Sequence, residues 1–230
     1  MVSTFISDRF TVGFGNCMEV FPTMNDKSVD FTLTDIPYDE VNRESNGLRT
    51  LNKDNADVIT FDLLEFCEQV YRVTKNSICI FCGRKQFSTI YTFFSEKNGA
   101  VKPVVWEKTN PSPMNGQRVY LNGIELAVWF KRGGGQTFNA HCKNPVFKYP
   151  IGKSNLHPTE KNHLLLQDLI LDNTNAGDTV FDPCMGSGST GLVAINLDRK
   201  FIGTELNENY FSIAKQRLVN ASNEADRRFW

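Results

Sequence analysis

The sequence is notable first for what it lacks. No stretch approaches the ~18 consecutive apolar residues of a membrane-spanning helix, and the N-terminus has no basic start followed by an apolar segment. Internal repeats and low-complexity segments are also missing. We therefore expect a cytoplasmic protein with no membrane partner, and no repeat or fibrous architecture.

Cysteine is present, but not in an arrangement that indicates a metal site. The six cysteines are scattered, mostly in apolar runs. Cys79 and Cys82 have CxxC spacing, yet they lie in a run typical of a buried strand, and no second pair matches them. We expect reduced thiols and no bound metal.

A strong excess of one charge is lacking too. The net charge of −1 does not by itself indicate a nucleic-acid partner. Residues 102–161, however, carry nine Lys/Arg and three Glu, a balance of +6 that leaves −7 for the remainder. Such asymmetry is typical either of a solvated face or of a one-sided phosphate-binding surface.

The 230 residues suit a single domain in which strands alternate with helices. Seven strands are predicted, at residues 9–15, 29–34, 78–82, 101–106, 124–130, 179–181 and 201–203. This alternation predicts an α/β fold with a mostly parallel seven-stranded sheet and helices on both faces. The strands at 101–106 and 124–130 are expected to form an antiparallel pair, and the polar tail at 220–230 is expected to fray.

Residues 179–205 form the most informative stretch. A short apolar run ends in Asp182 and Pro183, a glycine-rich turn and an apolar helical pattern follow, and a second apolar run ends in Glu205. Glycines let backbone N–H groups approach a ligand closely, and a helix N-terminus favours a carboxylate or phosphate. A carboxylate at the end of the next strand can accept the hydroxyls of a ribose. This unit is predicted to hold a nucleoside-bearing cofactor.

The residues of this unit alone do not choose the cofactor. Residues 186–191 also fit GxGxxG, so a dinucleotide site stays open, and so does a tight turn whose glycines serve only helix–strand packing.

A second constellation, Asp35-Ile36-Pro37-Tyr38, ends the predicted strand at 29–34. Ligands of open α/β sheets bind along the edge where parallel strands end, so this segment should lie near the glycine-rich turn. The Asp35 carboxylate and the Ile36 carbonyl can accept both hydrogens of an exocyclic amine, while Tyr38 stacks on the ring that carries it. The alternative is an ordinary strand-ending turn with proline.

At this point the chain resembles the S-adenosylmethionine-dependent DNA amino-methyltransferases. Asp35-Ile36-Pro37-Tyr38 resembles the Asp-Pro-Pro-Tyr catalytic motif of that family, and residues 181–190 resemble its methionine-binding loop. Residues 202–205 resemble its ribose-binding strand, and residues 157–161 its His-Pro-Thr-Gln-Lys-Pro segment. Residues 106–111 and Glu125 are similar to a stretch that precedes target recognition. With the catalytic motif first and the cofactor motif last, the order matches the permuted β group.

The resemblance implies a Rossmann-like fold in one domain, with a catalytic part at 1–131, a short target-recognition segment at 132–156 and a cofactor-binding part at 157–220. It implies catalytic roles for Asp35, Ile36, Pro37 and Tyr38. It implies S-adenosylmethionine contacts for Asn16, Asp35, His157, Thr159, Lys161, Asp182, Pro183, Gly186, Ser187, Gly188, Ser189, Thr190, Glu205 and Leu206.

The implied activity is methylation of adenine N6 in double-stranded DNA, as in restriction-modification, near the nucleoid of a prokaryotic or phage-infected cell. Asp at the first motif position favours adenine over the N4 of cytosine. DNA contacts are expected from Lys108, Asn110, Arg118, Lys131, Arg132, Lys143 and Lys148. Because the recognition segment is short, the protein is expected to read a short site or to act with a partner subunit, either a second copy or another chain.

The sequence departs from the family pattern at two positions. Ile36 replaces the first proline of the catalytic motif, but the acceptor there is a backbone carbonyl, and Pro37 still favours an extended Ile36. Asn162 replaces a proline after Lys161. Three other classes stay open: a protein-glutamine methyltransferase, a nicotinamide-dependent dehydrogenase and a non-catalytic DNA-binding relative.

Overall fold

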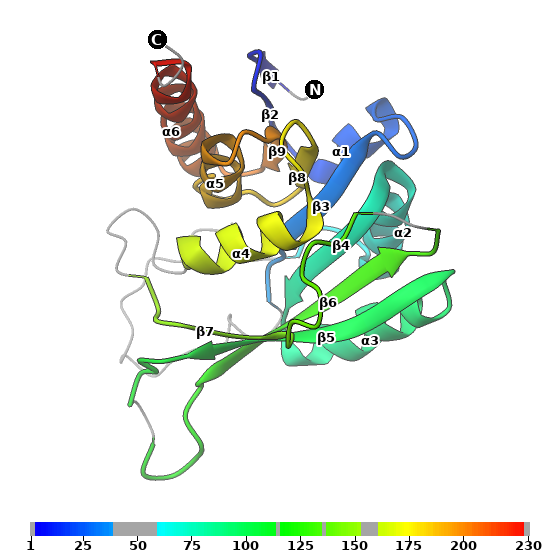
Figure 1. The fold of residues 1–230 in the computed structure, drawn as a ribbon, viewed down its shortest axis with the longest axis vertical. Coiled ribbons are helices and arrows are strands. Elements are labelled where there is room, and N and C mark those ends of the chain that lie inside the picture. Colours follow the sequence, from blue (N-terminus) through cyan, green and yellow to red (C-terminus); the bar gives the residue numbers. More distant parts are fainter. Residues whose placement is uncertain (1–2, 39–58, 114–115, 135–136, 153–160, 228–230) are drawn as a thin grey trace.

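The computed structural model describes residues 3–38, 59–113, 116–134, 137–152 and 161–227. Their strands form one sheet in the order β1-β2-β9-β8-β3-β4-β6-β5-β7, with helices on both faces (Figure 1). The predicted α/β class is therefore confirmed. The strands are β1 Ser3–Ile6, β2 Phe10–Phe14, β3 Val29–Asp35, β4 Thr74–Cys82, β5 Gly99–Lys108, β6 Ile124–Arg132, β7 Val146–Tyr149, β8 Thr179–Asp182 and β9 Lys200–Glu205.

Most of these strands run in the same direction. Among the described strands, β1 and β6 run opposite to the others, and the expected antiparallel pairing of β5 with β6 is confirmed. Strands β3, β8 and β9 consequently end at one edge, which we call the C-terminal edge of the sheet. The opposite edge, where β4 begins and β6 ends, is called the N-terminal edge.

The prediction of seven strands was wrong, because the described residues form nine. The two additional strands, β1 and β7, lie at the two ends of the strand order. Each is four residues long, and most of their side chains are exposed. Such short edge strands bury too little apolar surface to leave a hydrophobic run in the sequence.

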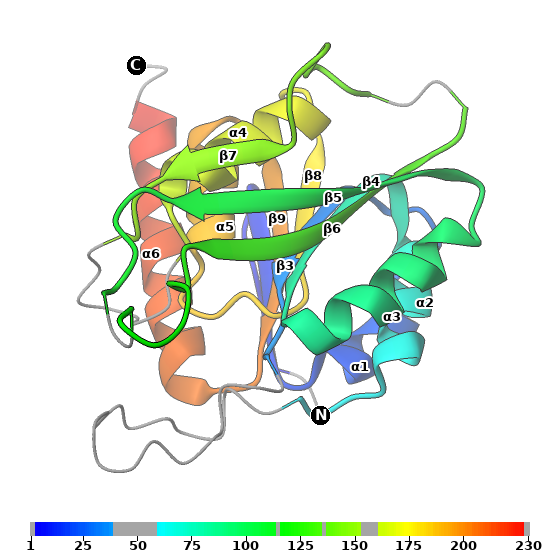
Figure 2. The same ribbon diagram turned by 90° about the horizontal axis from the view of Figure 1, so that it is seen from below.

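The helices form two layers, as Figure 2 shows. One layer contains α1 (Cys17–Val20), α2 (Leu63–Val73) and α3 (Arg84–Ser95), and the 3-10 turn Phe21–Thr23 follows α1. The other contains α4 (His163–Asn173), α5 (Ser189–Asn196) and α6 (Glu208–Arg227). Each layer packs on its own hydrophobic core, so the sheet is covered on both faces.

Residues 220–227 differ from the expectation of fraying. Helix α6 continues to Arg227, because Ala221 and Ala225 are 3% and 1% exposed and extend its apolar face into the core. None of the described helices combines the length and the hydropathy needed to cross a bilayer.

Gly191 allows α5 to lie close to β9 and α6. A Cβ at Gly191 would lie 2.6 Å from the ring of Phe201 and 2.8 Å from the side chain of Leu218, both of which are buried.

We predict that Gly191→Ala lowers the free energy of unfolding by about 1–3 kcal/mol through overpacking. Urea denaturation measures this change. Gly123→Ala is the control, since among the described residues its Cβ meets nothing closer than 3.9 Å; equal destabilisation by both variants would contradict the prediction.

Candidate active site

Three carboxylates converge where parallel strands end. Asp35 ends β3, Asp182 ends β8 and Glu205 ends β9, and these three strands are neighbours in the sheet. The register pairs Asp182 with Gly203 and Asp35 with Phe81 of β4. The catalytic and glycine-rich segments singled out in the sequence are thus brought to the same C-terminal edge.

The Asp35 carboxylate is held on one side only. Its Oδ2 lies 2.6 Å from Nζ of Lys161, the residue that precedes the capping residue of α4. Its Oδ1 is buried and has no hydrogen-bond partner among the described residues. Buried polar atoms are nearly always paired, so an unpartnered oxygen at the sheet edge where ligands of open α/β sheets bind indicates a ligand.

Lys161 also contacts a second carboxylate. Its Nζ lies 2.7 Å from Oε2 of Glu125 on β6, and Oε1 of Glu125 lies 2.7 Å from Nζ of Lys108 on β5. Lys161 donates a further hydrogen bond of 3.2 Å to the hydroxyl of Tyr38, which itself donates to Glu125. Two lysines and two carboxylates therefore alternate along the edge, with the Tyr38 hydroxyl beside them.

The pKa shifts of these groups follow from burial and charge pairing. Burial disfavours the charge of Lys161, but Asp35 and Glu125 outweigh that effect and raise its pKa. Burial likewise opposes ionisation of Glu125, yet Lys161 and Lys108 lower its pKa to about 2. Burial raises the pKa of Asp35, and Lys161 opposes that rise.

The segment at 35–38 is also tied to a helix. Ile36 is buried, and its N–H donates to the carbonyl of Phe81 at 3.2 Å. Gln86 accepts from the N–H of Gly83 at 2.7 Å and donates to the carbonyl of Pro37 at 2.9 Å. The sequence analysis did not predict this anchor. A signal for it was present, because Gln86 stands three residues after the N-cap residue Gly83, which is the spacing of a capping box.

The glycine-rich loop is shaped by two glycines. Gly186 and Gly188 have φ of 52° and 81°, a region that favours glycine. Asp182 supports the loop from below, because its Oδ1 accepts from Thr34 Oγ1 at 2.8 Å and from the N–H of Cys184 at 3.1 Å. Arg217 on α6 donates to the carbonyl and the hydroxyl of Ser187, so the loop is held from the helix layer too.

Glu205 closes the loop from the neighbouring strand. Its two carboxylate oxygens accept from the N–H groups of Gly186, at 2.8 Å, and Asn207, at 2.7 Å. Burial raises the pKa of Glu205, and these two backbone N–H groups oppose the rise. Gly15, which precedes Asn16, donates its N–H to the Glu205 carbonyl at 2.9 Å, so the end of β2 joins the same edge.

The structure places the remaining residues with implied cofactor contacts as follows. Asn16 caps α1 by accepting from the N–H of Met18 at 3.0 Å, and Leu206 is 47% exposed beside Glu205. His157 and Thr159 lie outside the described residues. Pro183 lies in the glycine-rich loop, and Ser189 and Thr190 lie in the first turn of α5. No group of three His, Cys, Asp or Glu suited to a metal ion occurs in the described part of the chain.

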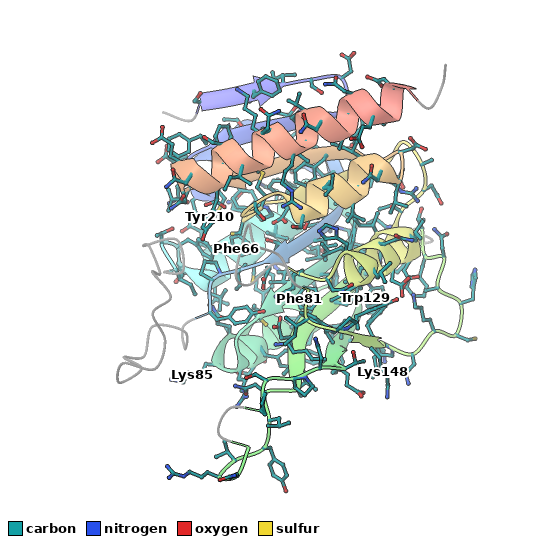
Figure 3. All side chains as sticks on the ribbon, turned by 90° about the vertical axis from the view of Figure 1, so that its left-hand side faces the viewer. Phe66, Phe81, Lys85, Trp129, Lys148 and Tyr210 are labelled. Carbon is teal, nitrogen blue, oxygen red and sulfur yellow. The ribbon has the colours of Figure 1, made fainter. Side chains whose placement is uncertain are left out.

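The residues expected to contact DNA divide between the two edges. Lys108, Asn110 and Lys148 lie where β5 and β7 end, at the C-terminal edge, and Arg118 lies on the β5–β6 connection there. Figure 3 shows this connection projecting beyond Lys85 and Lys148. Three consecutive apolar residues of this connection, Val119, Tyr120 and Leu121, are exposed, and Tyr120 is fully so.

Lys131, Arg132 and Lys143 lie elsewhere. Lys131 and Arg132 end β6 at the N-terminal edge, and Arg132 donates to backbone carbonyls of Tyr71 and Thr74. Lys143 forms ion pairs with Asp168 and Asp172 of α4. No described contact brings these three residues to the C-terminal edge.

The known proteins that this chain resembles are methyltransferases. A family model described as DNA methylase matches residues 143–216. The chain is 31% identical over 140 residues to type II methyltransferase M2.DpnII of Streptococcus pneumoniae, a match covering 54% of this chain and only 52% of that protein. It is 26% identical over 247 residues to type II methyltransferase M2.MboI of Moraxella bovis, covering 91% and 87%. A crystal structure of the M1.HpyAVI-SAM complex matches with a TM-score of 0.71 and 31% identity, covering 91% of this chain and 98% of that one.

The buried Asp182 makes a pH-dependent contribution to stability. Burial raises its pKa to about 7, although hydrogen bonds from Thr34 and Thr190 oppose the rise. The folded chain therefore binds a proton that the unfolded chain releases near pH 4, and stability should fall as pH rises from about 4 to 7. We predict that the free energy of unfolding of Asp182→Asn, which keeps the oxygen acceptor, falls by about 1–3 kcal/mol less than that of the wild type over this pH range. Denaturation at several pH values measures it.

The control for this prediction is Glu224→Gln, which removes an exposed carboxylate from α6. It should leave the pH dependence of unfolding as in the wild type. Identical pH profiles for Asp182→Asn and the wild type would show that the carboxylate does not titrate as expected.

Proposed function

Because the chain belongs to the family of DNA N6/N4 amino-methyltransferases, we propose that it transfers the methyl group of S-adenosylmethionine to N6 of adenine in double-stranded DNA. Asp35 carries this proposal. Its buried Oδ1 has no partner among the described residues and lies on the strand next to β8, from which the glycine-rich loop leaves. A hydrogen-bond acceptor beside a nucleoside site is what an amine substrate requires.

The residues at the C-terminal edge fit the cofactor. A Cβ built at Gly186 would meet no atom of the described residues within 4 Å, so these residues leave space beside the loop backbone. The loop N–H groups and the start of α5 suit the carboxylate of the methionine part. Glu205 suits the ribose hydroxyls, since each of its oxygens has lone-pair capacity beyond one backbone N–H. When bound, S-adenosylmethionine supplies an electrophilic methyl group.

The chain's own residues orient the amine. Oδ1 of Asp35 and the carbonyl of Ile36 accept its two hydrogens, which directs the nitrogen lone pair towards the methyl group. Tyr38 stacks on the base, which must leave the duplex to reach this edge. Transfer would form the new nitrogen–carbon bond as the carbon–sulfur bond of the cofactor breaks, with that electron pair left on a neutral sulfur, and the proton of the amine would pass late to Asp35. No covalent intermediate with the protein is required.

The choice of base rests on Asp35 itself. In the family, Asp at this position accompanies adenine more often than cytosine, and the family model covers both N6 and N4 chemistry. The family order also supports the proposed division into a catalytic part at 1–131, a recognition segment at 132–156 and a cofactor part at 157–220. DNA in the cytoplasm is the proposed substrate.

We place the DNA against the C-terminal edge. Lys108, Asn110, Arg118 and Lys148 are the proposed contacts, because the target base must reach Asp35. Of these, Lys108 is paired with Glu125 and Lys148 with Glu107, whereas Arg118 lies on the projecting β5–β6 connection. A second subunit would supply further contacts if the recognition segment alone is too short.

The reaction is tested with cofactor carrying a labelled methyl group, mixed-sequence DNA and analysis of the digested nucleosides. We expect label in N6-methyladenine and a loss of about 100-fold or more in rate for Asp35→Ala, because the amine loses its acceptor. Asp226→Ala, an equal truncation at the surface of α6, is the control. Label on cytosine N4 would correct the base, and label in no DNA would contradict the proposal.

DNA binding at this edge is tested by its salt dependence. We predict that Arg118→Ala reduces the slope of log affinity against log salt by about 1, because one phosphate contact is lost. Lys75→Ala, which removes an exposed cation from the N-terminal edge, should leave the slope unchanged. Equal slopes for Arg118→Ala and the wild type would move the interface away from the β5–β6 connection.

A further inference from the structure

The contacts of Lys161 point to a role that differs from a cofactor contact. Its Nζ is enclosed by aromatic rings, at 5.1 Å from the centroid of Phe81, 5.4 Å from that of Tyr38 and 5.9 Å from that of Trp106. Lys161 is 9% exposed. The ammonium group is therefore fixed in place by its surroundings before any substrate binds.

The ammonium group of Lys161 binds one of the two carboxylate oxygens of Asp35 and not the other. Oδ2 receives the ion pair at 2.6 Å, while Oδ1 is left buried and without a partner among the described residues. A purely structural ion pair would be expected to satisfy both oxygens, because an unpaired buried oxygen is costly. The arrangement instead leaves one acceptor ready for a donor that comes from outside.

We propose that Lys161 is a positioning residue for the reacting carboxylate: it fixes Oδ2 of Asp35, so that Oδ1 stays oriented towards the target amine. Glu125 competes with Asp35 for the same ammonium group, and Lys108 limits that competition by binding the far oxygen of Glu125. The role given to Lys161 rests on the proposed methyl transfer, but the titration of Asp35 that tests it can be measured without that activity.

The charges around Asp35 give opposite signs to two substitutions. Lys161 lowers the pKa of Asp35, whereas Glu125 raises it. The other titratable groups that face Asp35 are Tyr38 on the following segment, Cys82 at the end of β4 and Asp182 at the end of β8. None of these supplies a second positive charge, and the ion pair of Lys108 is with Glu125. Removing Lys161 should therefore favour the protonated carboxyl, and removing the charge of Glu125 should favour the ionised one.

The experiment follows the carboxyl carbon of Asp35 by NMR across a pH titration of the full chain, with the signal assigned by Asp35→Asn. We expect Lys161→Met to move the Asp35 titration upwards by about 1 pH unit or more, and Glu125→Gln to move it downwards. Lys161→Arg, which keeps the charge, should restore most of the wild-type titration. The control is Lys97→Met, which also removes a lysine paired with a carboxylate (Glu68) and packed on aromatic rings, but far from this edge.

Activity adds a second readout. The acid limb of the pH profile of kcat should move with the Asp35 titration in each variant, while KM for DNA changes less. An unchanged Asp35 titration in Lys161→Met would overturn the inference. If that variant does not fold, Glu125→Gln decides: a downward shift supports the inference, and no shift or an upward shift overturns it. If the wild type methylates no DNA, the proposed function fails, but the titration still tests the role of Lys161.

Discussion

The architecture of the site depends on one buried ammonium group. Nζ of Lys161 joins the end of β3, the start of β6 and the segment before α4, which are far apart in the chain. Removing one partner from a buried ion pair typically costs about 3–5 kcal/mol, because an uncompensated charge remains. The position of the carboxylate proposed to hold the amine is thus coupled to the packing of α4 on the sheet.

The glycine-rich loop is organised on a different principle. Here the backbone supplies the donors, and two carboxylates from neighbouring strands accept them: Asp182 below the loop and Glu205 beside it. Both carboxylates are buried, and burial raises the pKa of each. The loop is held by its own strands and by Arg217, while the described residues leave space beside Gly186. Such a preformed loop lowers the entropy that cofactor binding must overcome.

Much of the fold was predictable, because seven of the strands bury enough apolar side chains to leave a pattern. The convergence of Asp35 with the loop at 182–190 was predictable too, since parallel strands end at one edge. The short strands β1 and β7 were not, as each buries little surface. The contacts of Arg132 with backbone carbonyls were also not predictable, because the sequence does not distinguish a solvent-exposed arginine from one that binds the backbone of another segment.

The α/β class, the order of the motifs and the chemistry available at each strand end all follow from the amino-acid sequence. These depend on local pattern and on the residue type at each strand end, which the chain states directly. Which charged side chains meet, in contrast, depends on how the strands are arranged in the folded chain. Lys161 finds Asp35 and Glu125 because β6 runs antiparallel beside β4, which brings residue 125 to the edge where residue 35 ends its strand. No spacing along the chain encodes that encounter, since it arises from strand order and direction.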